Sequence, residues 1–339
     1  MSHIKDAWST LLHKLQKILA AFNRVDAKGV KRVSHATARS RTEVLIQGFR
    51  DLFGLGFKLR NPNNFSPRHM QALVREWEAK GLATSTLQWR FSVFNTFCRW
   101  IGKAGMLGNL TDHLVDPTRA KRSYVIKEKK TWTMKGIDVA TKILEVAQDD
   151  SYVALQLLVM WTFGLRAQEA WLLKPLLADQ GAYLAVCWGT KGGRDRTVTI
   201  RNAAERLVLE LLKRHADSAT GSLIPARFSL RAWKSHFYRV CREHGVSRRD
   251  GIVPHGLRHE LANELYERLC KELAEKYEHS IPEADADKVQ ADNQDSQDLA
   301  RRVVTETLGH SRPAITNCYL GPKPPRKKKK KKSNQGPQK

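Results

Sequence analysis

The sequence predicts a mainly α-helical protein with one small antiparallel β-sheet, organised as two domains. Apolar residues recur through most of the chain at the spacing of an amphipathic helix. Two short β-like runs, 182–188 and 195–200, flank a glycine-rich turn and indicate a hairpin. Residues 116–130 are basic and lack apolar periodicity, which is typical of a linker. The regions on either side of this linker are each long enough to bury a core of their own.

The first domain is predicted at 36–115 and follows an N-terminal helical extension at 1–35. The extension has one apolar face, made of Trp8, Leu11, Leu12, Leu15, Ile18, Leu19 and Phe22. Within the domain, Ser66 as N-cap and Pro67 at the first position predict a helix start. We interpret the aromatic residues of the next helix as core rather than base-stacking groups: Phe91, Phe94 and Phe97. Four basic residues on outer faces could reach phosphates: Arg68, Arg75, Arg90 and Arg99.

The second domain is predicted at 131–320. Helices are expected at 134–147, 152–163, 203–214 and 230–244, and from His255 onward. Residues 271–299 hold nine acids against three lysines, and we predict an acidic insertion that is loop or partly disordered. The last segment, 321–339, is predicted to be a disordered tail, because its prolines at 322, 324 and 325 exclude a helix.

Charge is the main compositional feature of the chain. The net charge is +25, of which +9 lies in residues 320–339 and +16 on the rest. A basic tail alone is explained by a solvated low-complexity segment. A basic body as well favours a polyanionic partner, and nucleic acid fits best.

Other features narrow the class of protein and its location. The chain has no run of about 18 apolar residues, so no membrane span is expected, and its start does not resemble a signal peptide. The five cysteines are far apart without CxxC pairing, which argues against a zinc site or disulfides and fits a cytoplasmic protein. The chain has neither a P-loop nor a carboxylate cluster.

Six residues could together carry phosphoryl transfer: Arg166, Lys191, His255, Arg258, His310 and Tyr319. This chemistry needs a nucleophile, fixed cations on the non-bridging oxygens and an acid for the leaving oxygen. Arginine suits the second role because its planar fork meets two phosphate oxygens. His255 and Arg258 are at i and i+3 and share a helix face, and Pro254 places His255 near a helix start, where anions are favoured.

Each of these residues taken alone has a simpler interpretation. Arg166 and Glu169 fit an ordinary helical ion pair, and Lys191 fits a solvated lysine in a glycine-rich turn. A lone histidine at such positions is more often structural, and a lone Tyr319 would be an ordinary surface or core residue. The occurrence of all six residues in this order is what favours a catalytic role for them.

These motifs, in this order, resemble those of the tyrosine recombinase (phage integrase) family. They are the segments 164–169, 190–193, 255–259 and 308–310, with Tyr319 nine residues after His310. The match is specific over about 130–320, whereas 42–110 resembles the family's smaller domain only in pattern. The implied fold is a two-domain, C-shaped DNA clamp, with a helical core-binding domain at 36–115 and the catalytic domain at 131–320.

The resemblance implies a site-specific DNA recombinase that forms a 3′-phosphotyrosine intermediate. It also implies that no metal and no ATP are needed, because the bond energy is stored in the phosphotyrosine, and the absence of a P-loop or a carboxylate cluster agrees. Tyr319 would attack the scissile phosphate, while Arg166 and Arg258 hold its non-bridging oxygens. Lys191 would protonate the leaving 5′ oxygen, His255 would assist proton transfer and His310 would hydrogen-bond the phosphate. Two residues would only support the site: Glu169, which orients its neighbours, and His259, which we expect to be structural.

The resemblance also implies partners and a role. The substrate would be double-stranded DNA of a mobile element or phage, integrated or excised by a homo-oligomer, a tetramer on paired sites. The protein would be cytoplasmic and nucleoid-associated when bound to DNA. The sequence leaves open the target site, the directionality and the need for accessory DNA-bending proteins.

Two departures from the family pattern lead to further expectations. Arg258 and His310 are 52 residues apart, roughly twice the expected spacing, and the surplus is the acidic insertion, which we expect to contact a neighbouring protomer or a basic surface. After Tyr319 the tail carries seven unbroken cations, which we expect to bind DNA phosphates non-specifically: Arg326, Lys327, Lys328, Lys329, Lys330, Lys331 and Lys332.

Two other functions fit parts of the same pattern. A type IB topoisomerase would relax DNA by the same chemistry without pairing sites. A non-catalytic DNA-binding protein of the same fold is disfavoured by the intact set of six residues.

Overall fold

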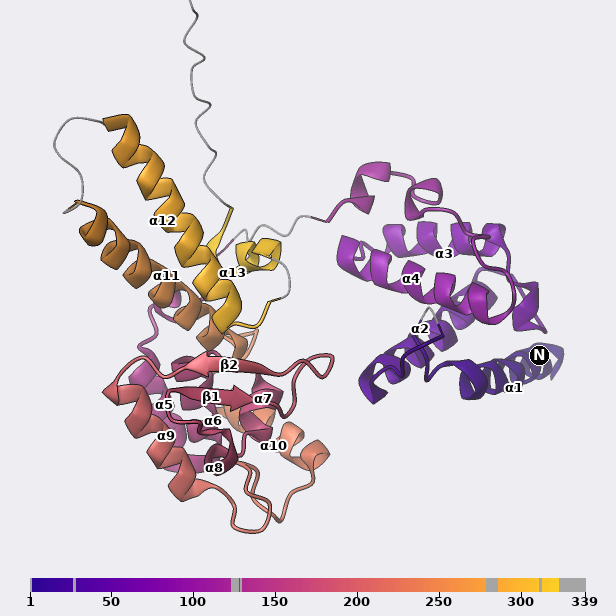
Figure 1. Cartoon of the computed structure of the whole chain (residues 1–339). Helices are drawn as coiled ribbons and strands as arrows, with labels where there is room; N and C mark the ends of the chain where they lie inside the picture. The colour runs from indigo at the N-terminus through magenta and orange to yellow at the C-terminus, as the bar shows by residue number, and fades with distance from the viewer. Residues whose placement is uncertain are drawn as a thin grey trace, which may run out of the picture. The chain divides into compact units, whose positions relative to one another are not determined.

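The computed structural model describes residues 2–26, 29–122, 128, 130–278, 286–310 and 313–322 (Figure 1). The chain divides into two compact units, Met1–Ser123 and Tyr124–Lys339. The described residues are mostly helical, and they contain one two-stranded antiparallel sheet. This confirms the predicted fold class. Within the described ranges, no helix is both long and apolar enough to cross a bilayer.

The first unit is built from helices. They are α1 (Ser2–Phe22), α2 (His35–Gly54), α3 (Pro67–Ala79) and α4 (Thr84–Trp100), with short 3-10 turns at Pro62–Asn64, Leu110–Asp112 and Pro117–Ala120. Its core is rich in aromatic rings, because Phe49, Phe65, Phe94 and Phe97 pack against one another with centroids 5.0–6.4 Å apart. Phe91, Phe94 and Phe97 are buried, so the interpretation of these residues as core is confirmed.

Two helix starts test the sequence rules. α3 begins at Pro67 with Ser66 as its N-cap, as predicted. The second domain's first helix was expected from residue 134, but α5 begins only at Val139. Gly136 takes a left-handed conformation there, and the side chain of Asp138 accepts a hydrogen bond from the Thr141 amide, so the helix starts anew at that cap.

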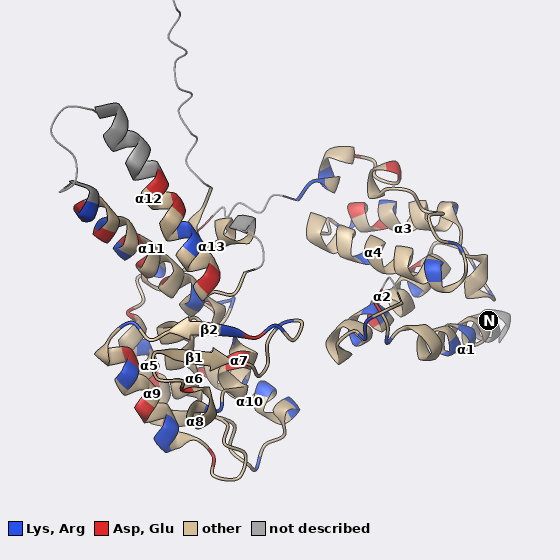
Figure 2. Ribbon diagram, in the orientation of Figure 1, with Lys and Arg blue, Asp and Glu red and all other residues tan. Residues whose placement is uncertain are grey.

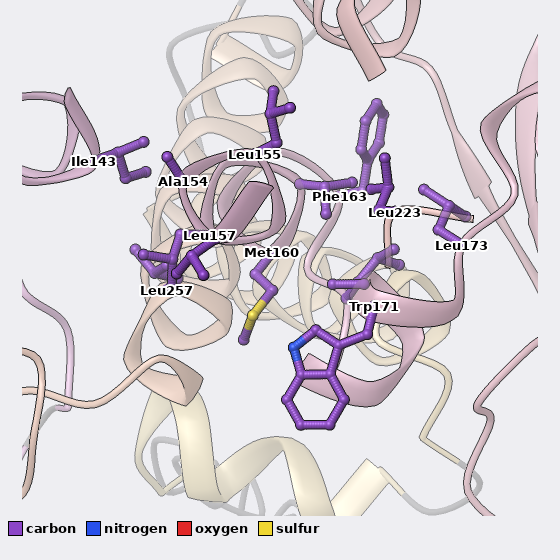
Figure 3. Packing of buried hydrophobic residues seen from close by; sticks show 14 of the residues in the cluster. Ile143, Ala154, Leu155, Leu157, Met160, Phe163, Trp171, Leu173, Leu223 and Leu257 are labelled. Atoms are coloured by element: carbon purple, nitrogen blue, oxygen red, sulfur yellow. The ribbon is translucent and has the colours of Figure 1, made fainter. Parts of the chain in front are cut away.

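The second unit packs its other elements around one apolar helix, α6 (Ser151–Phe163). In chain order the elements are α5 (Val139–Asp149), α6, α7 (Ala167–Leu172), α8 (Pro175–Ala178), β1 (Tyr183–Val186), β2 (Arg196–Thr199), α9 (Ala203–His215), α10 (Leu230–Glu243), α11 (His255–Glu278), α12 (Ala286–Thr307) and α13 (Asn317–Leu320), with 3-10 turns at Thr133–Lys135 and Pro313–Thr316. Figure 3 shows α6 contributing Leu157, Met160 and Phe163 to the core, where Trp171 and Leu257 also lie.

The hairpin pairs Leu184 with Val198 and Val186 with Arg196. Its inner face buries Leu184, Val186 and Val198, whereas the turn that holds Lys191 is exposed. The predicted runs 182–188 and 195–200 therefore contain both strands, which are shorter than the runs.

The acidic insertion is helical where it is described. Residues 271–278 extend α11 and 286–299 form the first part of α12, so the expectation of a loop is wrong over these ranges. The two helices lie side by side in Figure 1, and Figure 2 shows acidic residues along both. Acidic residues are no obstacle to a helix once its other side packs, here through buried Ser296 and Ala300. The tail cations 326–332 lie outside the described residues, as do residues 123–127 and 129 of the linker predicted at 116–130.

Candidate active site

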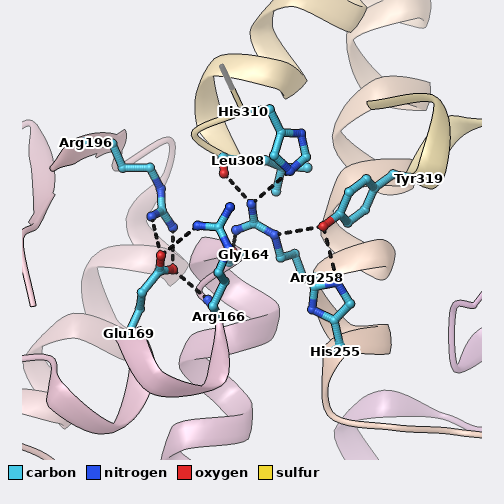
Figure 4. A network of polar contacts seen from close by, with 9 residues as sticks. All are labelled: Gly164, Arg166, Glu169, Arg196, His255, Arg258, Leu308, His310 and Tyr319. Carbon is cyan, nitrogen blue, oxygen red and sulfur yellow. Dashed lines mark hydrogen bonds and ion pairs between the residues drawn. The ribbon is translucent and has the colours of Figure 1, made fainter. Parts of the chain in front are cut away.

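Five of the six predicted site residues meet where separate helices of the second unit end or begin (Figure 4). Arg166 lies at the start of α7, and His255 and Arg258 occupy the first turn of α11. His310 lies in the turn after α12, and Tyr319 lies in α13. Lys191 is on the exposed turn between β1 and β2, outside this cluster.

Arg166 is held by Glu169 through both its backbone and its side chain. As N-cap of α7, Arg166 donates its backbone N–H to Glu169 Oε2 at 2.7 Å and its Nη1 to Oε1, also at 2.7 Å. Glu169 is fully buried. Burial alone would raise the pKa of Glu169, but hydrogen bonds and charges from Arg196 and Arg166 outweigh it and lower the pKa to about 2. The carboxylate therefore stays ionised.

Arg196 is a member of the site that sequence reasoning missed. It begins β2, and its Nη1 and Nη2 donate to Oε1 and Oε2 of Glu169, both at 2.8 Å. A signal was available, because Arg196 and the buried Val198 are two residues apart and so share one face of the strand. An arginine on an inward face needs a carboxylate partner.

Arg258 is completely buried and links three elements. Its Nη1 donates to the Gly164 carbonyl and its Nη2 to the Leu308 carbonyl. Its Nε lies 3.3 Å from the Tyr319 hydroxyl, and Nη2 lies 3.3 Å from His310 Nε2. Burial lowers the pKa of Arg258 to about 10, so the guanidinium is still charged at neutral pH.

Tyr319 is buried with its hydroxyl between a cation and an imidazole. Besides Arg258 Nε, the hydroxyl has His255 Nε2 at 3.3 Å. The Tyr319 ring stacks on the His259 ring with centroids 4.2 Å apart. The centroid of the His310 ring is 5.0 Å from that of Tyr319. The phenol is thus fixed in the pocket that holds the arginines.

The three histidines around Tyr319 favour the neutral form. Enclosure by protein and the charges of Arg258 and Arg166 lower the pKa of His255, although one side of this residue is exposed. Burial lowers the pKa of His259 to about 3. Burial and the nearby arginines also lower the pKa of His310 to about 3. A neutral His255 can accept the phenol proton at Nε2.

The arrangement suits an anion. Arg258 and three histidines that favour the neutral form surround the Tyr319 phenol, Arg166 lies in the same cluster, and the carboxylate of Glu169 is already paired. In the described part of the chain, no group of three His, Cys, Asp or Glu residues is placed to hold a metal ion. A phosphate group fits the donors that the site presents.

Comparison with known proteins agrees with this geometry. Residues 128–264 match the family model described as integrase, and residues 13–107 match the one described as phage integrase, N-terminal. A curated relative is tyrosine recombinase XerC of Xanthomonas axonopodis pv. citri (strain 306). It is 25% identical over 263 residues, which are 75% of this chain and 73% of the relative.

Solved structures share the fold at low identity. A lambda integrase fragment, as a dimer bound to a COC′ core site, is 14% identical with a TM-score of 0.53, covering 90% of this chain and 94% of that one. XerH recombinase bound to difH is also 14% identical, with a TM-score of 0.51 and coverage of 93% and 92%. By the two family models, which together match most of its residues, the chain belongs to the tyrosine recombinase (phage integrase) family. It is a DNA-binding recombinase, and the activity of its family is site-specific DNA recombination.

Proposed function

We propose that this protein integrates or excises the DNA of a mobile element or phage, through a covalent bond between Tyr319 and the 3′ phosphate of the cut strand. The observation that carries the proposal is the environment of the Tyr319 hydroxyl. It lies 3.3 Å from both Arg258 Nε and His255 Nε2, so a cation and a proton acceptor converge on one phenol.

In the proposed reaction, the Tyr319 oxygen attacks the scissile phosphorus and the bond from phosphorus to the 5′ oxygen breaks. The phenol proton passes to neutral His255, and Lys191 on the hairpin turn protonates the departing 5′ oxygen. Arg166 and Arg258 stabilise the charge on the non-bridging oxygens, with His310 as a further donor. Rejoining is the reverse, with a 5′ hydroxyl attacking the phosphotyrosine. Neither a metal ion nor ATP takes part in these steps.

The two units would have different roles. The catalytic domain is the part at 131–320, and the helical part at 36–115 clamps the DNA, joined by the linker at 116–130. A fold relative supports DNA of this kind, since the Tn1549 transposon integrase was solved in complex with transposon right end DNA. We propose a homo-oligomer that assembles on paired sites as a tetramer, in the cytoplasm at the nucleoid, with accessory DNA-bending proteins as possible further partners.

A covalent adduct tests the chemistry. Overlapping nicked duplexes from the DNA that flanks the gene are incubated with the full chain and separated under denaturing conditions. We expect a protein–DNA adduct that blocks the 3′ end and leaves a free 5′ hydroxyl. Tyr319→Phe keeps the stacked ring without the nucleophile and should give no adduct.

The same assay separates the other functions. Absence of an adduct with the wild-type chain on every duplex would favour a non-catalytic DNA-binding protein. An adduct accompanied by relaxation of supercoiled plasmid, without strand exchange between two duplexes, would favour a type IB topoisomerase.

A further inference from the structure

Arg196 differs from the other two arginines of the site because a carboxylate occupies both of its terminal nitrogens. Arg166 gives only Nη1 to that carboxylate, and Arg258 donates to two main-chain carbonyls. Both terminal nitrogens of Arg196 point at Glu169, at 2.8 Å each, in the two-pronged geometry that arginine forms with a carboxylate. The side chain is 9% exposed, and its buried Nε has no hydrogen-bond partner in the described part of the chain. Arg196 is therefore not oriented to hold a phosphate oxygen.

The carboxylate that Arg196 holds is the one that fixes Arg166. Glu169 accepts from the backbone N–H and Nη1 of Arg166 with the same two oxygens that accept from Arg196. A buried carboxylate shared by two arginines has little freedom to turn, so the position of one guanidinium sets that of the other (Figure 4).

Arg196 also reaches the turn that carries His310. A Cβ at Gly309 would collide with Cδ of Arg196, so the arginine stem lies directly against this backbone. The same residue begins the strand that follows the Lys191 turn. The Arg196 side chain thus connects to Arg166 through Glu169 and to His310 through Gly309, and the backbone of Arg196 is the start of β2, which follows the Lys191 turn.

We infer that Arg196 is a positioning residue for DNA cleavage, which holds Arg166 through Glu169 and fixes the base of the Lys191 hairpin against the Gly309–His310 turn. The inference rests on the proposed function and extends it to a residue without direct contact to DNA. Lysine at this position would keep the charge but could not span both carboxylate oxygens, so the anchor would be lost while the charge stayed.

The test compares Arg196→Lys with a matched arginine elsewhere in the unit. Arg201 is 15% exposed, pairs with Glu205 at 2.6 Å and donates to the Thr162 carbonyl at 2.7 Å, away from the cluster of Figure 4. Full-length chains are measured on the nicked duplex that gives the wild type its highest adduct yield. The readouts are the single-turnover cleavage rate, the Kd for the same DNA and the melting temperature.

We expect Arg196→Lys to lower the cleavage rate by about tenfold to a hundredfold, with the Kd within about twofold of the wild type. Arg201→Lys should cleave at the wild-type rate. Equal cleavage by Arg196→Lys and the wild type would overturn the inference. So would losses in both lysine variants that follow their losses in melting temperature, because a structural role then suffices.

A double variant covers the case in which Arg196→Lys does not fold. Glu169→Gln with Arg196→Met removes the buried carboxylate charge together with one of its two arginine partners, which is milder than leaving that charge buried without Arg196. DNA binding with slow cleavage supports positioning, and cleavage at the wild-type rate overturns it. A wild-type chain without any adduct would defeat the proposed function and this inference with it. An adduct from the wild type but not from Tyr319→Phe, with normal cleavage by the double variant, would defeat the inference alone.

Discussion

At the scale of single residues, the site keeps histidines neutral in a pocket with several cations. His259 is the clearest case, since it is 5% exposed and its Nδ1 has no hydrogen-bond partner in the described part of the chain. A proton on its ring would add charge beside Arg258 in a buried place. The unfolded chain accepts that proton more readily, so stability and protonation are linked.

His259→Phe should therefore flatten the pH dependence of stability. The pKa of His259 is about 3 in the folded chain and about 6.5 in the unfolded chain, so its protonation favours unfolding as pH falls below about 6.5. Between these two pKa values, protonation of His259 lowers the free energy of unfolding by about 1.4 kcal/mol for each unit that the pH falls. Phenylalanine can keep the stack on Tyr319 without titrating. Urea unfolding from pH 6.5 to 4.5 measures the slope, and identical slopes for both chains would contradict the low pKa.

At the scale of elements, short turns place the reactive groups. The turn after α12 holds His310 in position through Gly309, which has a φ of +60° and no room for a side chain beside Arg196. The left-handed conformation and the close approach both require glycine here.

Gly309→Ala should lower the free energy of unfolding by about 1–3 kcal/mol and slow cleavage, because the turn must move away from Arg196. Gly245→Ala is the matched control. Gly245 has a φ of +70° and nothing within 4 Å of an added Cβ, so it carries the backbone strain without the collision. Similar cleavage rates in the two variants would show that the contact with Arg196 does not position His310. Single-turnover cleavage and urea unfolding give both quantities.

The described parts of the acidic insertion, 271–278 and 286–299, lie on the paired helices α11 and α12 (Figure 1). The packed part of these helices lies near the site, where Leu265, Val304 and Leu308 surround Tyr319. The acidic part lies at the end of α11 and the start of α12, away from Tyr319, and should not be required for cleavage.

Replacing residues 275–297 by a short glycine-rich turn should leave adduct formation on a single nicked duplex unchanged. We expect strand exchange between two duplexes to fall, because the insertion is predicted to contact a neighbouring protomer or a basic surface. Gel-filtration of the protein–DNA complex, together with the exchange assay, measures the effect. Unchanged assembly and exchange would remove that role.

At the scale of the whole molecule, the charge of +25 should dominate non-specific DNA binding. The nine cations of 320–339 are close together in sequence, whereas the other charges are spread over both units. Truncation after Gly321 should therefore lower the slope of log Kd against log salt concentration. The slope would fall by up to about 8 if every tail cation contacts a phosphate. Filter binding over a salt series measures the slope. An unaltered slope would mean that the tail does not contact DNA.

The fold class and most helices of this chain follow from the sequence because apolar periodicity is a local property. The start of α3 depends on two adjacent residues, Ser66 and Pro67, and is predictable for the same reason. The delayed start of α5 was not predicted, because a left-handed glycine competes there with a good helical pattern. The helices of the acidic insertion were missed because composition does not reveal that one face packs.

The candidate site was predictable only in part. Motif order pointed to Arg166, His255, Arg258, His310 and Tyr319, which the structure brings together. Arg196 lies outside the family motifs, and its pairing with Glu169, which is 27 residues earlier in the chain, depends on the register of the hairpin. Distances between residues of this kind are set by tertiary packing, which a single sequence does not encode locally.

Arg258 has a practical consequence for trapping complexes with DNA. Its guanidinium joins the end of α6 to the end of α12 through the Gly164 and Leu308 carbonyls, so it is a cross-link of the domain as well as a candidate catalytic group. An inactive enzyme made by replacing Arg258 would leave two buried carbonyls without a donor. Crystallographic or cryo-EM work on a stalled synapse would therefore be better served by Tyr319→Phe, which removes one oxygen atom and leaves that cross-link in place.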